Sequence, residues 1–399
     1  MMTPGPGLNR TLLPKGFSAG AINSGVRRYR PDLGIIISEV PSIAAGVFTL
    51  NQCKAAPVIF SQARVPSDNI RAIITNSGQA NAATGDTGFE RNLMMVSAAA
   101  KSLGCSIDQV LVASTGVIGH QLDTDKILPA IPELIERAHE TAEAFASAIM
   151  TTDLVPKTAT NELQLSSGSV RITGISKGSG MIHPNMATML GYIISDVKIS
   201  KDFAHTCLKT AVDMSFNMIS VDGDSSTNDC CFLMANGASG VELKTEEDIL
   251  KFQTAVNELS IFLAKSIAAD GEGASKLVEV EIIGSDDKEI AKRAARGVTL
   301  SPLIKTALHG EDPNWGRILA RLGAEQVPAD QLAKMSLSLQ GVKIFENGQP
   351  LAFVRDEVKA LLKQSNIFIK IDLKSGDVRQ TAWGCDLSKK YVEINTEYS

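Results

Sequence analysis

The segment from residue 177 to residue 190 constrains the fold of this chain more than any other. It reads KGSGMIHPNMATML: two glycines and a proline come first, then the small pair Ala187–Thr188, then the apolar run from Met189 to Ile194. Glycine permits backbone conformations that other residues avoid, and proline fixes φ, so we expect an irregular path leading into a buried strand. The sequence therefore predicts a threonine hydroxyl at the mouth of that strand.

Length and composition indicate a large globular protein. The chain has 399 residues, of which 44% are hydrophobic and 21% charged, and its formal net charge is -5. Because this length exceeds what one core usually supports, we expect two domains or two interlocked layers. No basic tract indicates a nucleic-acid partner, and no apolar run approaches the roughly 20 residues of a membrane helix. Since no signal or transit segment is recognisable, we expect a cytoplasmic protein.

Cysteine and histidine spacing does not predict a metal site. The six cysteines show no CxxC pair, and the five histidines show no HxxxH or HExxH pattern. We expect free thiols in a reducing compartment and no metal.

Hydrophobic patterns predict both strands and helices. Apolar runs bounded by turn residues predict strands at residues 33–37, 45–50, 70–74, 110–113, 169–175, 190–194, 277–283 and 367–371. A 3.6-residue period predicts helices at residues 132–150, with Pro132 in the first turn, at 203–218, at 245–269 with Thr245 as N-cap, and at 357–363. We expect an α/β or α+β protein with helices covering its sheets.

Cleavage of the Ala187–Thr188 bond would turn Thr188 into a self-contained nucleophile. A threonine hydroxyl needs a base to take its proton. A free α-amine, with a pKa of about 7.7 to 8.0, is partly neutral near pH 7 and can serve as that base. These residues alone leave an ordinary strand entry as the other interpretation, since Ala-Thr before an apolar strand is common.

Other polar segments also have two interpretations. Ser114, Thr115 and Gly116 offer a hydroxyl beside a flexible amide, which suits either an oxyanion hole or a strand-ending turn. Residues 177–180 resemble only part of a phosphate loop. Residues 220–229 have the alternating acids of a calcium loop but lack its distal glutamate, which favours a polar turn. His183 is a candidate base or a packing residue.

Taken in order, these segments resemble the ornithine acetyltransferase family, the glutamate N-acetyltransferases of the cyclic arginine pathway. The likeness spans nearly the whole chain and is carried by residues 13–17, 54–58, 151–153, 177–190, 220–229, 270–276, 312–317 and 395–399. The resemblance implies an αββα sandwich like that of a group of self-processing aminopeptidases. It also implies self-cleavage into an α chain, residues 1–187, and a β chain, residues 188–399, assembled as α2β2.

The activity that this resemblance implies is acetyl transfer. Thr188 would take the acetyl group from N2-acetylornithine, release ornithine and pass the acetyl group to L-glutamate in a ping-pong cycle. No cofactor is expected, and acetyl-CoA stays open as a second donor. The resemblance implies an oxyanion hole at Thr115 and Gly116 and substrate contacts at Thr151, Lys177, Thr188, Glu272, Asn395 and Ser399. At the Thr151–Thr152 step either threonine can be the one that contacts substrate, and Thr151 is favoured.

The chemistry of these residues agrees with amino-acid substrates. Lys177 and Asn395 suit an α-carboxylate, and Glu272 suits the side-chain ammonium of ornithine. Departures from the family pattern occur at Gln79 and Ala83, where Asn and Cys are common, at Ser275, where Thr is common, and in the tail after Asn395, which is one residue short.

Two other functions compete with acetyl transfer. A self-cleaving amidohydrolase or aminopeptidase would use water as the acceptor, and Lys177 and Glu272 are the residues that argue against it. A non-catalytic amino-acid-binding protein would retain the scaffold without the chemistry.

Overall fold

The computed structural model describes residues 11–139, 141–183 and 189–396, and the chain forms two compact units. Unit 1 comprises residues 1–178, 185–217 and 225–263, and unit 2 comprises residues 179–184, 218–224 and 264–399. Two units agree with the expectation from chain length. Because each unit is assembled from separated segments, no single linker marks a boundary in the sequence.

Over the described residues, unit 1 contains an eight-stranded sheet with the order β4-β3-β2-β9-β7-β6-β5, and β1 pairs with β2. Its strands are β1 (Phe17–Ile22), β2 (Leu33–Phe48), β3 (Ser67–Gln79), β4 (Val110–Val117), β5 (Lys157–Leu165), β6 (Gly168–Lys177), β7 (Leu190–Ser195) and β9 (Cys230–Ala235). β7 and β9 are parallel neighbours, whereas β6 runs antiparallel to β7.

The long strand β2 belongs to both halves of this sheet. Its first half pairs with β1 and β3 and its second half with β9, and the register with β3 shifts after Ile37. Buried residues from both halves, such as Ile73 of β3 and Phe232 of β9, form one core cluster. Thr75 and Tyr192 also form a buried hydrogen bond of 2.8 Å between the halves. The two halves therefore pack face to face.

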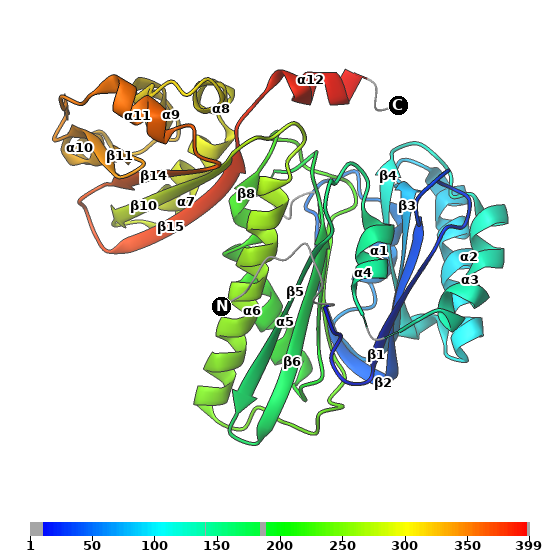
Figure 1. The fold of residues 1–399 in the computed structure, drawn as a ribbon. Helices are drawn as coiled ribbons and strands as arrows, with labels where there is room; N and C mark the ends of the chain where they lie inside the picture. The colour runs from blue at the N-terminus through cyan, green and yellow to red at the C-terminus, as the bar shows by residue number, and fades with distance from the viewer. Residues whose placement is uncertain (1–10, 140, 184–188, 397–399) are drawn as a thin grey trace. The chain divides into compact units, whose positions relative to one another are not determined.

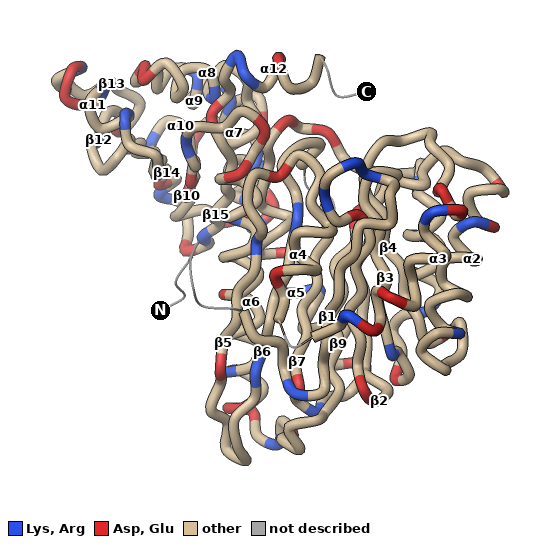
Figure 2. The backbone as a smooth tube through the Cα atoms, turned by 45° about the vertical axis from the view of Figure 1, so that its right-hand side comes forward, with Lys and Arg blue, Asp and Glu red and all other residues tan. Residues whose placement is uncertain are grey.

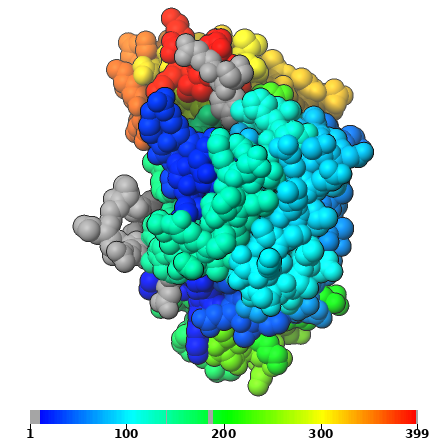
Figure 3. Space-filling model, turned by 90° about the vertical axis from the view of Figure 1, so that its right-hand side faces the viewer, coloured from blue at the N-terminus to red at the C-terminus, as the bar shows by residue number. Residues whose placement is uncertain are grey.

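Helices cover the outer faces of these two layers. They are α2 (Gly85–Leu103), α3 (Thr124–Glu136), α5 (Lys201–Asp213) and α6 (Glu246–Ala269), the last of which continues into unit 2. Two shorter helices, α1 (Ala56–Gln62) and α4 (Glu143–Ile149), contribute Val58 and Phe145 to the core cluster that the two layers share. α2 and α3 lie on the side of β3 and β4, and α6 lies on the side of β5 and β6 (Figure 1). Figure 3 looks onto the outer surface of α2 and α3. The predicted αββα sandwich is confirmed.

Unit 2 is built on a second sheet, with seven strands among the described residues in the order β13-β12-β11-β14-β10-β15-β8. The strands are β8 (Ile219–Ser220), β10 (Leu277–Ser285), β11 (Ser336–Leu339), β12 (Val342–Glu346), β13 (Gln349–Pro350), β14 (Asn366–Asp372) and β15 (Val378–Cys385). Its helices are α7 (Lys288–Leu300), α8 (Pro302–His309), α9 (Trp315–Ala324), α10 (Ala329–Lys334), α11 (Arg355–Leu361) and α12 (Lys389–Thr396).

The single helix predicted at residues 132–150 is wrong. α3 begins at Thr124 and contains Pro129 and Pro132 in its interior, and α4 is a separate helix. Between the two helices, the backbone of His139 exchanges hydrogen bonds of 2.9 Å with Ala19 of β1. Pairing with a strand far away in the sequence interrupts the helix, and a local apolar period cannot show such a partner.

The other predicted elements are confirmed with altered ends. Residues 33–37 and 45–50 belong to one strand, β2, and the strand predicted at 110–113 continues to Val117. The helix predicted at 203–218 ends at Asp213 and is followed by a short 3-10 turn. Thr245 does cap α6, because its hydroxyl accepts a hydrogen bond of 3.1 Å from the amide of Asp248.

Charge and cysteine usage agree with the composition. Basic and acidic residues are interspersed along the chain (Figure 2), and all six cysteines are free. Within the described residues, none of the helices combines the length and apolar character of a membrane span.

Candidate active site

A buried ionic network lies at the C-terminal end of β6. Lys177, the last residue of β6, donates a hydrogen bond of 3.2 Å to the Thr151 hydroxyl. The Asp153 carboxylate accepts hydrogen bonds of 2.7 Å from the Lys157 ammonium and from the Gly178 amide. Lys177, Lys157 and Asp153 are at most 4% exposed. The structure thus brings together two of the predicted substrate contacts, Thr151 and Lys177.

Two ammonium groups of this network act on one carboxyl group, that of Asp153. Burial alone would raise the pKa of the Asp153 carboxyl, but the Lys157 and Lys177 ammonium groups and the Gly178 amide lower it to about 2. Asp153 is therefore ionised at neutral pH and is paired with Lys157. Lys177 adds a second positive charge beside a hydroxyl, an arrangement that suits a carboxylate ligand.

The predicted oxyanion residues lie within β4 and not in a turn after it. β4 continues through Thr115 and Gly116 to Val117, so the strand-ending turn is ruled out. Gly116 has a φ of +132°, and a Cβ there would lie 2.2 Å from the carbonyl carbon of Gly78 on β3. Only glycine fits such an approach between the two backbones.

A polar loop before β9 contacts both β4 and the residue before β7. The Asn228 side chain donates hydrogen bonds of 2.9 Å to the Ser114 carbonyl and 2.6 Å to the Ala80 carbonyl. The next side chain, Asp229, accepts a hydrogen bond of 3.1 Å from the Met189 amide. Sequence reasoning missed both residues, because it interpreted residues 220–229 as a polar turn. The sequence feature that could have indicated Asn228 and Asp229 is the polar run that ends directly before the buried strand β9.

Within unit 2, Glu272 and Asn395 are in direct contact. The Asn395 side chain donates a hydrogen bond of 2.8 Å to the Glu272 carboxylate. The Glu272 amide donates a hydrogen bond of 2.9 Å to the Ser179 carbonyl. A Cβ at Gly180 would lie 2.4 Å from the Glu272 carboxyl carbon, so Gly180 leaves room for this carboxylate. Two further predicted substrate contacts are therefore neighbours, and their carboxylate suits an ammonium group.

Asp222 holds the backbone on the N-terminal side of the predicted cleavage point. Its carboxylate accepts hydrogen bonds of 2.6 and 2.8 Å from the amides of Met181 and Ile182. His183 Nδ1 lies 3.3 Å from the Ser220 hydroxyl. Burial lowers the pKa of His183 to about 4, so its ring is neutral at pH 7 and accepts a proton weakly.

The remaining predicted site residues, Ala187, Thr188 and Ser399, lie outside the described residues, and their roles stay predictions. In the described ranges, no group of three or more His, Cys, Asp or Glu side chains is arranged to hold a metal ion.

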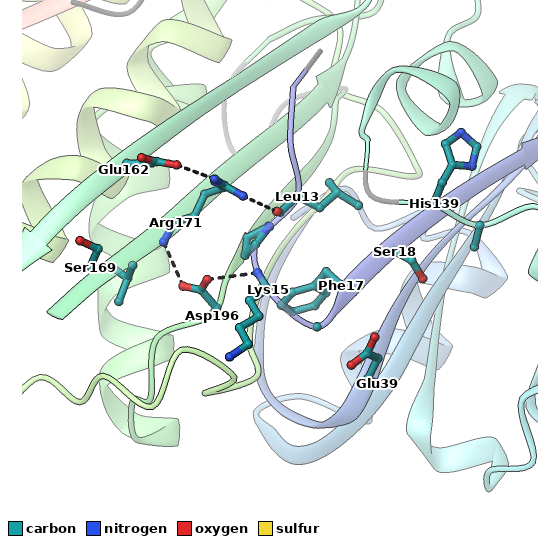
Figure 4. A pocket seen from close by; sticks show the side chains of 14 residues that line it. Leu13, Lys15, Phe17, Ser18, Glu39, His139, Glu162, Ser169, Arg171 and Asp196 are labelled. Atoms are coloured by element: carbon teal, nitrogen blue, oxygen red, sulfur yellow. Dashed lines mark hydrogen bonds and ion pairs between the residues drawn. The ribbon is translucent and has the colours of Figure 1, made fainter. Parts of the chain in front are cut away.

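A pocket of about 840 Å³ lies in unit 1 at the other end of β6 (Figure 4). Arg171 pairs there with Glu162 and donates a hydrogen bond of 3.1 Å to the Leu13 carbonyl. Asp196 accepts a hydrogen bond of 3.1 Å from the Lys15 amide. From Arg171 to the end of β6 is roughly 20 Å at the usual strand rise. The pocket contains none of the predicted site residues.

Unit 1 thus holds a buried cation beside a hydroxyl at the end of β6 and a close backbone approach at Gly116. Residues 18–399 match the model of the ArgJ family. The chain belongs to this family, as the resemblance predicts, and is an enzyme of arginine biosynthesis.

Individual relatives support this assignment over nearly the full chain. The arginine biosynthesis bifunctional protein ArgJ of Thermotoga neapolitana is 45% identical over 395 residues, which cover 97% of this chain and 99% of the relative. The protein of the same name from Dehalococcoides mccartyi is 44% identical, with 97% and 96% covered. The crystal structure of ArgJ from Bacillus halodurans is 36% identical with a TM-score of 0.51, and covers 53% of this chain and 100% of that chain.

Proposed function

We propose that this protein is a glutamate N-acetyltransferase that moves the acetyl group of N2-acetylornithine to L-glutamate through an acetyl-Thr188 intermediate. The observation that carries the proposal is the buried Lys177–Thr151 pair at the end of β6. Both substrates are α-amino-acid derivatives and share an α-carboxylate, which this cation and hydroxyl suit.

In the first half-reaction, the Thr188 hydroxyl attacks the acetyl carbonyl carbon while its own α-amine takes the hydroxyl proton. The oxyanion is stabilised at Thr115 and Gly116. The C–N bond then breaks, the proton goes to the departing ornithine amine, and an acetyl ester stays on Thr188. In the second half-reaction, the glutamate amine attacks this ester, the C–O bond to Thr188 breaks, and a proton from the glutamate amine goes to the threonine oxygen.

Charge complementarity distinguishes the two substrates in this proposal. The buried Glu272 carboxylate pairs with the side-chain ammonium of ornithine. The Asn395 side chain orients the Glu272 carboxylate by donating a hydrogen bond to it. Ser399 supplies a further contact by the same resemblance. The relatives are named bifunctional, so this proposal includes a second activity, with acetyl-CoA as the acetyl donor.

We also propose self-cleavage between Ala187 and Thr188 and an α2β2 assembly in the cytoplasm. The solved Bacillus halodurans chain supports cleavage, because it matches along its whole length and yet spans 53% of this chain. Residues 188–399 make up about that share of the sequence.

The test combines processing with transfer. Purified protein is expected to show two bands on denaturing electrophoresis, with the second starting Thr-Met-Leu-Gly, and to acetylate glutamate from N2-acetylornithine. Thr188→Ala is the control and should stay as one chain without activity. A single intact band from protein that transfers acetyl groups would contradict the mechanism. If turnover is independent of glutamate and yields acetate, the protein is an amidohydrolase; parallel assays with acetyl-CoA test the second donor.

A further inference from the structure

Three arginines and a tyrosine stand together in the loop of residues 23–32, which joins β1 to β2 in unit 1. Residues 27–30 read RRYR, in a chain whose formal net charge is -5. Arg28 and Arg30 are exposed, and neither guanidinium group is paired with a carboxylate among the described residues. Tyr29 is 80% exposed, more than any other large hydrophobic side chain in the described ranges. These three side chains are therefore open to a ligand.

The loop is held in one conformation by two of its own side chains. The Asn23 amide group donates hydrogen bonds of 3.1 Å to the Arg27 carbonyl and 2.7 Å to the Arg30 carbonyl. The Asp32 carboxylate accepts hydrogen bonds of 2.7 and 2.8 Å from the amides of Ser24 and Arg27. Asp32 itself is 1% exposed. Because the backbone of the loop is fixed in this way, a ligand would not have to order it on binding.

Arg27 attaches the loop to both predicted site segments of unit 1. Its guanidinium group donates a hydrogen bond of 2.5 Å to the carbonyl of Met150, the residue directly before Thr151. A Cβ at Gly78 would lie 3.1 Å from the Arg27 Cγ. Gly78 is also the residue of β3 that Gly116 of β4 approaches. The loop therefore borders the Thr151 segment and the predicted oxyanion segment.

The exposed side chains of the loop have the chemistry that recognises a nucleotide. Guanidinium groups stay charged and bind phosphate oxygens through paired hydrogen bonds. An aromatic ring in solvent offers a face on which a base can stack. The Arg28 Cζ lies over the Tyr29 ring, 5.0 Å from its centroid, so the cation and the ring stay together. N2-acetylornithine and glutamate carry neither a phosphate nor a base, so neither of them would use these groups.

We propose that the loop binds the adenosine phosphates of acetyl-CoA, the second acetyl donor of the proposed function, on which this inference rests. Arg28 and Arg30 bind the phosphate oxygens, and the adenine ring stacks on Tyr29. The pantetheine arm of acetyl-CoA is a flexible chain between the phosphates and the thioester. The nucleotide is therefore held at the border of the site while the arm extends toward the Thr151 and Gly116 segments.

The test measures binding to the purified full-length protein by calorimetry, so it does not depend on turnover. CoA should bind, and pantetheine, which lacks the nucleotide, should bind more weakly. The double variant Arg28→Gln with Arg30→Gln should raise the Kd of CoA about tenfold or more, because it loses charge-assisted hydrogen bonds to phosphate. A wild-type Kd in this variant overturns the proposal. ATP is the other probe, and tighter binding of ATP than of CoA would assign the loop to another nucleotide and overturn the proposal as well.

Lys101→Gln with Arg137→Gln is the matched control. Lys101 on α2 and Arg137 after α3 are both exposed, so this variant removes the same charge from another part of unit 1. It should bind CoA with the wild-type Kd. An equal rise of the Kd in both double variants would show that net charge attracts CoA, and the loop would then not be its site.

Tyr29 tests the stacking separately from the charges. Tyr29→Phe keeps the ring and should bind CoA as the wild type does. Tyr29→Ser removes the ring and should raise the Kd of CoA about fivefold or more, the lower range for the loss of one stacked base. Equal affinities of the two variants would show that the adenine does not stack on Tyr29.

A salt titration of the wild type keeps the proposal testable if the arginine variant does not give the wild-type circular dichroism spectrum. Contacts between exposed charges weaken as salt is added, so the Kd of CoA should rise with salt and that of pantetheine should not. A Kd of CoA that is independent of salt would contradict binding through Arg28 and Arg30.

Failure of this inference is distinguishable from failure of the proposed function. If the wild type transfers no acetyl group from N2-acetylornithine to glutamate, the proposed function fails. If the wild type performs this transfer but does not bind CoA, or binds it without the loop, only this inference fails.

Discussion

At the scale of single residues, Gly116 shows how a missing Cβ sets the position of a strand. Its φ of +132° and the 2.2 Å that would separate a Cβ from the Gly78 carbonyl carbon exclude any side chain. The clash involves main-chain atoms of β3, so rotation of a side chain cannot relieve it. The close approach of the Gly116 backbone to β3 therefore fixes the positions of Thr115 and of the Gly116 amide on β4.

Gly116→Ala is therefore expected to lower the free energy of unfolding by at least about 3 kcal/mol and to abolish transfer. Gly119→Ala is the control, because Gly119 also has a positive φ, +86°, but nothing lies within 4 Å of its Cβ position. It should lose about 1 kcal/mol. Urea unfolding measures both, and equal losses would show that strain alone acts at Gly116.

The Asp153–Lys157 pair gives a second prediction at this scale. The side chains are 0% and 1% exposed and 2.7 Å apart. Asp153→Asn would remove the carboxylate charge that lies beside the buried Lys157 ammonium, so we expect a loss of about 3 to 5 kcal/mol in urea unfolding. Glu247→Gln breaks an exposed pair with Lys251 and should change stability by about 0.5 kcal/mol or less. Similar losses for both variants would contradict the electrostatic account.

The same pair predicts an acid transition. The pKa of Asp153 is about 2 in the folded protein and about 3.9 when unfolded, so the ionised form stabilises the folded state above that higher value. This contribution is lost as pH falls from about 4 through 2. The melting-temperature difference between wild type and Asp153→Asn should shrink over that range and stay constant from pH 5 to 7.

At the scale of elements, the docking of α12 depends on the turn that carries Glu272. A Cβ at Gly273, where φ is +70°, would lie 2.5 Å from the Tyr391 nitrogen of α12. The Ser388 hydroxyl donates a hydrogen bond of 2.6 Å to the Gly273 carbonyl. Together with the Asn395–Glu272 contact, these interactions hold α12 against the turn.

Gly273→Ala should release α12 and separate Asn395 from Glu272. We expect amide hydrogen exchange in residues 389–396 to accelerate and the KM for N2-acetylornithine to rise about tenfold, the effect of about 1.4 kcal/mol of lost binding. Gly341→Ala, at a positive φ of +82° with nothing within 4 Å of its Cβ position, is the control and should leave both unchanged. If amide hydrogen exchange in residues 389–396 stays slow in the Gly273→Ala variant, the docking of α12 does not depend on a glycine at position 273.

At the scale of the whole molecule, one continuous sheet contains strands from both sides of the predicted cleavage point in the sequence. β7 and β9 follow it in the sequence, yet β7 pairs with β6 and β9 pairs with β2, both of which precede it. Buried residues of all four strands share one core cluster. The two fragments would therefore be parts of one folding unit and not two domains.

We expect the fragments to co-elute in native size exclusion and to separate only in denaturant. Each half expressed alone should be insoluble, because it would expose the apolar strand edges that the other half covers. Co-expression of the halves as a control should restore soluble protein. Independent, soluble folding of residues 188–399 would show that the sheet does not depend on β2 and β6.

Local signals in the chain predicted much of this protein. The apolar run at residues 190–194 indicated β7, and the acidic first turn after Thr245 indicated α6, because strand burial and helix capping depend on neighbouring residues. The ordered motifs identified the family and pointed to Thr151 and Lys177. The interruption of the helix predicted at 132–150 had no local signal, since its cause is pairing with β1.

The sequence by itself determined the apolar strands, the main helices, the family and the residue types of the candidate site. Tertiary structure alone decided that β2 joins both layers, that Asn395 meets Glu272 and that Asp229 meets the Met189 amide. The physical reason is range: propensity and capping act within a few residues, whereas the partner of a buried charge or amide is set by which distant strands pack together.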